Sequence, residues 1–177
     1  MHGQQVDFIN EALDFFSSPD IAIDFRSNVK VLDCGSSDIN GNNRQFFRDN
    51  YQYTGVDIAP APNVDVVTPI HLYETDELYD VVLTGEMLEH DKTWKESIRK
   101  MISLVRPGGL FIMTCAAPGR PEHGTTKEHA WASPHTNDYY RNISATDFES
   151  LVDIHEEFSR YSLRYQDCDL LFYGLKR

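Results

Sequence analysis

The chain has 177 residues, a length typical of one domain with a full hydrophobic core and one functional pocket. Its 28 acidic and 16 basic side chains give a net charge of −12, which repels phosphate backbones and anionic membranes, so we expect neither nucleic acid nor a membrane as partner. Three widely spaced cysteines, and no basic region followed by an apolar core at the start, predict a cytoplasmic protein with free thiols.

Strand and helix patterns alternate along the chain. Apolar residues at helical spacing predict an amphipathic helix over residues 4–17, within an N-terminal segment 1–18 that packs on the sheet edge or covers the pocket. Further strands are predicted at residues 29–34, 51–58, 63–67, 79–85, 110–116, 154–163 and 169–177, and further helices at 43–50, 92–105 and 144–152. Strands separated by helices indicate a single α/β domain with a parallel sheet and right-handed crossovers.

Residues 116–142 differ from the rest, because they carry histidines, tyrosines, prolines and glycines but little periodicity. An ordered loop of this length within a compact domain is usually functional, so we expect it on the substrate side. After the loop, Ser144 and Asp147 stand at the spacing of a capping box and predict the start of the next helix.

The stretch VLDCGSSDING follows the first strand, where open α/β sheets bind ligands. A dinucleotide fingerprint would need glycines at positions 35, 37 and 40, but only Gly35 is present, with Ser37 and Asn40 in the other places. Asp33 would also put a carboxylate next to the phosphates. The pattern therefore favours a ligand without phosphates and with some positive charge.

Asp57 ends the second strand, 24 residues after Asp33. A carboxylate at this place can accept hydrogen bonds from both ribose hydroxyls of an adenosine. S-adenosylmethionine fits both observations, because it combines adenosine with a cationic sulfonium and an amino-acid tail.

Four segments in order, residues 31–41, 53–67, 79–90 and 104–116, resemble the class I S-adenosylmethionine-dependent methyltransferases, and among them the small type 11 branch. Residues 118–126 and 137–144 extend the resemblance. It implies a Rossmann-like three-layer sandwich whose seven-stranded, mostly parallel sheet has the order 3-2-1-4-5-7-6, with the last strand antiparallel.

The resemblance also implies a role for each matching residue. The backbone of Gly35, Ser36 and Ser37 would wrap the methionine moiety and Asp33 would receive its ammonium, Asp57 would hold the ribose with Ile58 against the adenine, and Thr84, Gly85 and Glu86 would face the transferred methyl group. The family's usual Gly-Asp-Ala after the third strand is replaced by residues 68–71, Thr-Pro-Ile-His, which leaves only the Ile70 backbone for the adenine.

The acceptor side is predicted from residue types in the loop. We expect Arg120, His123, His129, Tyr139 and Tyr140 to bind the substrate, and His90 or His135 to act as a general base. His123, His129 and His135 recur at six-residue intervals, without the tight pairs or nearby cysteines of zinc sites, so no metal is expected.

The sequence thus predicts an S-adenosylmethionine-dependent methyltransferase that acts on a small polar acceptor, such as a sugar or another metabolite hydroxyl, by in-line displacement. Two alternatives stay open at this point. One is a non-catalytic S-adenosylmethionine-binding module with a protein-interaction role, and the other is a dinucleotide-dependent oxidoreductase. The oligomeric state is left open.

Overall fold

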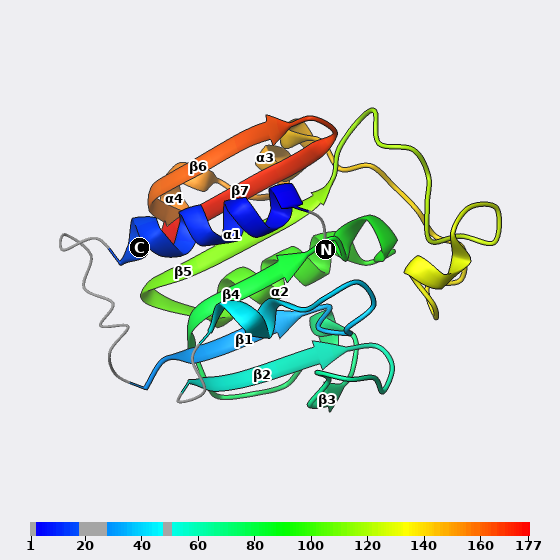
Figure 1. The fold of residues 1–177 in the computed structure, drawn as a ribbon. Coiled ribbons are helices and arrows are strands. Elements are labelled where there is room, and N and C mark those ends of the chain that lie inside the picture. The colour runs from blue at the N-terminus through cyan, green and yellow to red at the C-terminus, as the bar shows by residue number, and fades with distance from the viewer. Residues whose placement is uncertain (1–2, 18–27, 48–50) are drawn as a thin grey trace.

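The computed structural model describes residues 3–17, 28–47 and 51–177 (Figure 1), so the ends of the predicted 1–18 segment and of the predicted 43–50 helix lie outside the described residues. Seven strands form one sheet in the order β3-β2-β1-β4-β5-β7-β6, which confirms the predicted order. The strands are β1 Lys30–Cys34, β2 Gln52–Asp57, β3 Val66–Val67, β4 Tyr79–Gly85, β5 Val105–Ala116, β6 Phe158–Gln166 and β7 Asp169–Lys176. Of these, β7 runs antiparallel to both of its neighbours, and the pairs from β3 to β5 are parallel.

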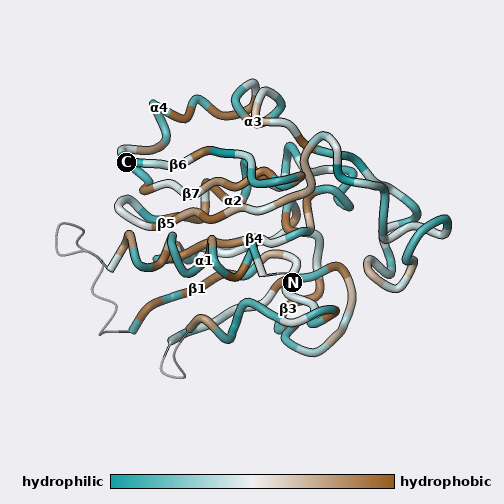
Figure 2. The backbone as a smooth tube through the Cα atoms, turned by 45° about the horizontal axis from the view of Figure 1, so that its top comes forward, coloured by the Kyte–Doolittle hydropathy of each residue, from teal (hydrophilic) through white to brown (hydrophobic). Residues whose placement is uncertain are grey.

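The strand register brings the ends of three strands to one edge. Asp33 of β1 lies opposite Gly55 of β2 and Leu83 of β4, so β1, β2 and β4 end at nearly the same level. The turns that follow these strands therefore meet beyond the carboxyl edge of the sheet. The central strands β1, β4 and β5 are rich in hydrophobic residues (Figure 2). Strands that are covered on both faces require this composition.

Helix α1, Gly3–Phe16, covers one face of the sheet (Figure 1). Its buried side chains pack against central strands rather than an edge strand, so the predicted packing on the sheet edge is wrong. The apolar stripe of α1 is wide enough to bury four side chains, and the central strands offer the largest flat apolar surface. This layer contains Phe8, Ile9, Ala12 and Phe16 of α1 with Val31, Val81, Leu83, Ile112 and Leu171 of the sheet.

Three helices cover the opposite face: α2 Trp94–Leu104, α3 Ala145–Leu151 and α4 Ile154–Glu157. The predicted capping box at α3 is confirmed, because Ser144 and Asp147 exchange side-chain and backbone hydrogen bonds. Residues 154–157, predicted as strand, are helical instead. The carboxylate of Asp153 accepts the backbone N–H of Glu156 at 3.2 Å and caps this turn, so the strand starts only at Phe158.

The described parts of the connections before β2 and after β3 contain 3-10 helices and no α-helix. The described part of the β1–β2 connection contains one 3-10 helix, Asn43–Phe46, and the β3–β4 connection contains another, Ile70–Leu72. Ile58, immediately after β2, and Val67, at the end of β3, are 43% and 52% exposed. None of the described helices is long and apolar enough to cross a bilayer.

Candidate active site

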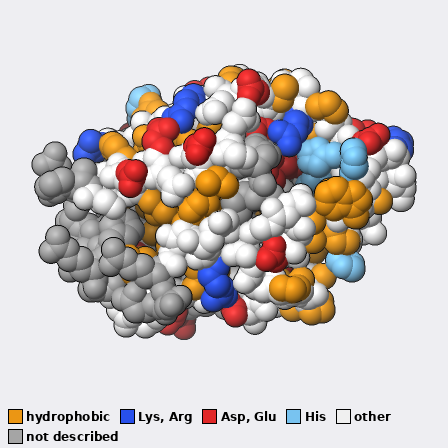
Figure 3. Space-filling model, viewed as in Figure 1, with side chains coloured by type: hydrophobic (Ala, Val, Ile, Leu, Met, Phe, Trp, Pro, Cys, Tyr) orange, Lys and Arg blue, Asp and Glu red, His pale blue; other side chains and the backbone are white. Residues whose placement is uncertain are grey.

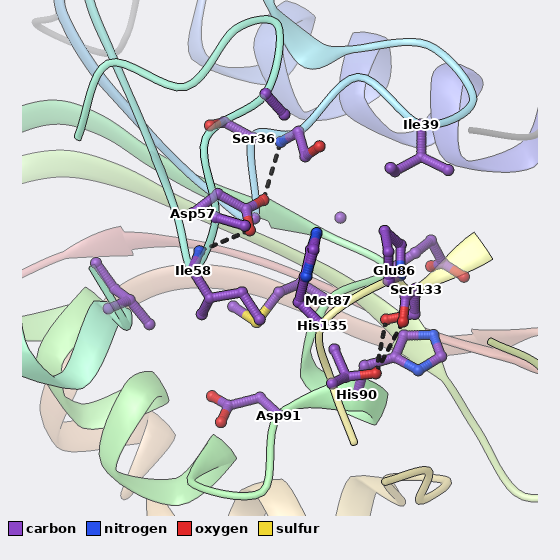
Figure 4. A pocket seen from close by; sticks show the side chains of 18 of the residues that line it. Ser36, Ile39, Asp57, Ile58, Glu86, Met87, His90, Asp91, Ser133 and His135 are labelled. Carbon is purple, nitrogen blue, oxygen red and sulfur yellow. Dashed lines mark hydrogen bonds between the residues drawn. The ribbon is translucent and has the colours of Figure 1, made fainter. Parts of the chain in front are cut away.

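A cavity of about 780 Å³ lies beyond the carboxyl ends of β1, β2 and β4 (Figure 4). Its size is within the range of sites for cofactors and small molecules. Residues 132–139 of the long loop close one side. Nearly all predicted cofactor contacts line the cavity: Asp33, Gly35, Ser36, Ser37, Asp57, Ile58, Ile70, Gly85 and Glu86. Thr84 is the exception, since it is buried within β4 and is not part of the lining.

The carboxylate of Asp57 is fixed by two backbone donors (Figure 4). Ser37 N–H donates to Oδ2 at 3.0 Å and Ile58 N–H donates to Oδ1 at 2.7 Å. An ionised carboxylate offers about four lone-pair sites, so each oxygen retains capacity for one further donor. Asp57 can therefore accept a pair of neighbouring hydroxyls without moving.

The turn after β1 approaches the turn after β4 very closely. Gly35 has a φ of +81°, and a Cβ at this position would stand 2.6 Å from the Cβ of Met87. Both the positive φ and the close approach require glycine here. The backbone N–H groups of Gly35 and Ser36 donate to the Val56 carbonyl at 2.9 and 3.2 Å, which holds the turn against β2.

Asp33 is buried at the wall of this cavity. Its Oδ2 accepts the hydroxyl of Tyr53 at 2.5 Å and its Oδ1 accepts the side-chain amide of Asn43 at 2.9 Å. Desolvation by burial outweighs these hydrogen bonds and raises the pKa of Asp33 to about 6. A cation placed beside this carboxylate would offset the cost of burying its charge.

Glu86, in the turn after β4, forms the opposite wall. It adopts a positive φ of 56°, and its Oε1 accepts the hydroxyl of Thr114 at 3.0 Å. Arg120 of the long loop lies 3.9 Å from Glu86 Oε2 and pairs with Asp169 at 2.7 Å. The position of the glutamate is thus set by the neighbouring strand and by a guanidinium.

Gln5 of α1 also lines the cavity, which sequence reasoning missed. Its side-chain amide fills the space that a Cβ on Gly85 would need, so the start of α1 touches the turn after β4. The expectation that the N-terminal helix covers part of the pocket therefore agrees with the structure. Gln5 could not be identified from the sequence, because a single polar residue near the start of an amphipathic helix does not indicate contact with a cavity.

A compact group of side chains lies at the base of the long loop. The rings of His90 and His123 are 5.0 Å apart, and both contact Tyr140. Desolvation, and then the neighbouring His123, lower the pKa of His90 to about 4, so its imidazole is neutral near pH 7. Beside them Glu89 is fully buried, and burial, followed by repulsion from Glu86, raises its pKa well above the usual range.

The structure places only some of the loop residues predicted to bind substrate at the cavity. Those that line the cavity are Arg120, His123 and Tyr139, together with the predicted bases His90 and His135. His129 does not, because it pairs with Glu128 at 2.9 Å in a shallow hollow outside the cavity and its side chain is 57% exposed. Tyr140 packs beneath the loop against the histidine rings. Histidine, acidic and basic side chains gather at the end of the molecule that carries this loop (Figure 3).

The family model described as "Methyltransferase domain" matches residues 2–162. The N-methyltransferase NodS from Bradyrhizobium japonicum WM9 is similar over 98% of this chain and 94% of its own, with a TM-score of 0.59 and 15% identity. Another similar structure is the 1,6-didemethyltoxoflavin-N1-methyltransferase from Burkholderia thailandensis, solved with 1,6-didemethyltoxoflavin and S-adenosylhomocysteine. The similarity covers 98% of this chain and 87% of that enzyme, with a TM-score of 0.58 and 16% identity.

A third similar structure is the phosphoethanolamine N-methyltransferase 2 of Haemonchus contortus, solved with S-adenosyl-L-methionine. Its TM-score is 0.65 at 14% identity, over 98% of this chain and 52% of that enzyme, so the present chain spans about half of its length. At these identities the structural neighbours show the fold alone. No curated protein sequence matches the chain.

Proposed function

We propose that this chain, which belongs to the methyltransferase domain family and is an S-adenosylmethionine-dependent enzyme, transfers the methyl group to a hydroxyl of a small polar acceptor, such as a sugar or another metabolite. The observation that carries the proposal is the chemical division of the cavity. One wall suits a phosphate-free adenosine compound, and the opposite wall carries mostly polar and charged side chains.

The cofactor is assigned to the wall formed by the ends of β1 and β2. Asp57 would accept the two ribose hydroxyls, and the backbone of residues 35–37 would surround the methionine moiety. Asp33 would receive the ammonium group. Burial raises the pKa of Asp33 to about 6, and the positive charge of the ammonium would offset the cost of keeping this carboxylate ionised. The exposed side chain of Ile58 would cover one face of the adenine.

The acceptor is assigned to the space between Glu86 and the long loop. Arg120, His123, His135 and Tyr139 line this part of the cavity and offer several hydrogen-bond donors and acceptors. The net charge of −12 also supports a small molecule rather than a nucleic acid as acceptor. Residues 132–139 of the long loop line this side of the cavity and would shield a bound acceptor from water.

The reaction needs alignment more than activation, because the sulfonium already makes the methyl carbon electrophilic. Holding an acceptor oxygen in line behind that carbon contributes on the order of 7 to 11 kcal/mol. The C–S bond breaks as the O–C bond forms, S-adenosylhomocysteine leaves, and the hydroxyl proton passes to a base. His135 is assigned this role, since it lines the cavity and its residue is exposed, whereas His90 is only 7% exposed.

The proposal is tested by supplying the protein with methyl-labelled S-adenosylmethionine and a small-molecule extract. We expect S-adenosylhomocysteine to form together with a labelled metabolite whose methyl group is on oxygen. A label on nitrogen or carbon would reject the hydroxyl assignment while leaving the cofactor assignment intact. The same mixture without the extract is the matched control.

A further inference from the structure

Several buried polar atoms without a hydrogen-bond partner are concentrated at one place in the described part of the chain. They are Nδ1 of His90, the hydroxyl of Tyr140 and both carboxylate oxygens of Glu89, which approach the backbone N–H groups of Glu89 and Ala116 without a hydrogen bond of normal geometry. Buried polar atoms in folded proteins are nearly always paired, so each exception calls for an explanation. Here the exceptions share one neighbourhood, because the Tyr140 ring contacts His90 and Glu89 precedes His90 in the chain.

His123 completes this group from the long loop. Its Nδ1 lies 3.1 Å from the carbonyl oxygen of Pro121, and a hydrogen bond there requires the proton on Nδ1. The lone pair is therefore on Nε2, which faces Glu89 Oε1 at 4.0 Å. A backbone carbonyl that orients an imidazole from behind is the usual arrangement for a metal-binding histidine.

Charge at this place also favours a cation. The guanidinium of Arg120 pairs with Asp169 at 2.7 Å and lies 3.9 Å from Glu86, whereas Glu89 beside them is fully buried. A divalent cation next to Glu89 would offset the cost of burying a charged carboxylate.

We propose that Glu89, His90 and His123 bind a divalent transition-metal ion. One ligand atom from each of the three side chains lies within 4.8 Å of the others. Ligands held at about 2.1 Å from a common ion stand roughly 3 to 3.5 Å apart, so small side-chain rotations complete the site. Two imidazole nitrogens with one carboxylate suit ions such as Mn²⁺, Fe²⁺, Co²⁺ or Zn²⁺ better than Ca²⁺ or Mg²⁺.

A proton on Glu89 explains the group less well than a metal ion. A neutral carboxyl would carry an O–H donor, yet His123 Nε2 stands 4.0 Å from the nearer Glu89 oxygen, beyond hydrogen-bond range. His90 Nδ1 would also remain without a donor. One cation in the centre satisfies all three side chains together.

The ion would lie at the acceptor wall, because His90 and His123 also line the cavity. Within the part of the chain that the structure describes, the group offers three protein ligands, so open coordination positions would remain for oxygen atoms of the acceptor. A metal-bound hydroxyl loses its proton more readily, which prepares an oxygen nucleophile. This last step rests on the proposed function, whereas metal binding itself does not.

The test uses the full chain without cofactor or acceptor and titrates it with Co²⁺. We expect one equivalent to bind, with visible d–d absorption bands that Zn²⁺ displaces. Glu89→Gln and His123→Gln should each weaken binding by roughly 10- to 100-fold or more, the loss that even removal of a group behind a ligand causes. His129→Gln is the matched control, because this exposed histidine of the same loop lies outside the group and should leave Co²⁺ binding unchanged.

Circular dichroism and S-adenosylhomocysteine binding check that each variant folds. If Glu89→Gln does not fold, Co²⁺ binding by His123→Gln is the deciding measurement, because the side chain of His123 is partly exposed and its replacement should be tolerated. The proposal is overturned if the unaltered chain binds no stoichiometric Co²⁺, or if His123→Gln binds it as tightly. Because the Co²⁺ titration contains no acceptor, a negative result would not affect the hydroxyl assignment. Likewise, a methyl label found on an atom other than oxygen would not affect the proposed metal site.

Discussion

Asp57 at the end of β2 accepts a hydrogen bond from the backbone N–H of Ser37, 3.0 Å away in the turn after β1. This contact joins the two chain segments to which the adenosine and methionine halves of the cofactor are assigned. The carboxylate is therefore oriented before any ligand arrives, which reduces the entropy lost on binding. Changes at either residue should act on cofactor affinity more than on the core.

Asp57→Ala should weaken S-adenosylhomocysteine binding by about 1.5 to 3 kcal/mol, because hydrogen bonds to a charged acceptor are lost. Asp57→Asn retains one acceptor oxygen, so its affinity for S-adenosylhomocysteine should lie between those of the unaltered chain and of Asp57→Ala. Calorimetric titration measures both affinities, and Asp76→Ala, an exposed position before β4, serves as control. Equal affinity in all variants would refute the ribose assignment.

Asp33→Asn should change how stability depends on pH. The folded-state pKa of Asp33 is raised from 3.8 to about 6, so its stabilising contribution is complete below pH 3.8 and is lost as pH rises through 6. Between pH 4 and 7 the unaltered chain should therefore lose on the order of 2 to 3 kcal/mol relative to the variant. Urea unfolding at several pH values measures this difference.

The same variant should bind S-adenosylhomocysteine more weakly at pH 7, since the ammonium group would lose its carboxylate. Greater stability of the free protein with weaker ligand binding distinguishes a functional acid from a structural one. A stability difference that does not vary with pH would contradict the assigned shift.

Gly35→Ala should destabilise the fold by about 1 to 3 kcal/mol, because the new Cβ meets Met87 and the φ of +81° is unfavourable for alanine. Adding Met87→Ala should recover part of the loss by removing the steric contact but not the backbone strain. Gly3→Ala is the control, since no atom lies within 4 Å of a Cβ there. Thermal unfolding and ligand titration report the two effects, and a Gly35→Ala chain as stable as the control would show that the turn is less crowded than described.

His135→Gln should lower the rate of S-adenosylhomocysteine formation in the presence of the small-molecule extract by about 100-fold or more, the usual contribution of a general base. Its affinity for S-adenosylhomocysteine should not change, because the side chain is assigned to the acceptor. His129→Gln should retain the rate, since His129 lies outside the cavity. A loss in the second variant but not in the first would exchange the two assignments.

The positions of the strands along the chain could be predicted because each one carries its own local signal, whereas their order in the sheet was implied by the resemblance to the methyltransferases. The run from Tyr79 to Gly85 is apolar, ends at a turn and has the predicted bounds. Residues 154–157 could not be assigned from the same signals, since a one-turn helix depends on the cap supplied by Asp153 rather than on periodicity. The position of α1 on the face of the sheet also depended on packing, because an amphipathic stripe does not specify which apolar surface it will meet.

Residues immediately after a strand end were placed correctly at the cavity, because the carboxyl ends of parallel strands define its position. The sequence by itself therefore determined the layered α/β architecture and the place of the cavity, both of which follow from short stretches of chain. Only the tertiary structure decided which loop side chains reach the cavity, and it brought His123 to Glu89 and His90, which lie more than thirty residues earlier in the chain. The reason is that such groupings depend on how a long loop without periodic pattern folds back onto the sheet, and no local interaction encodes that path.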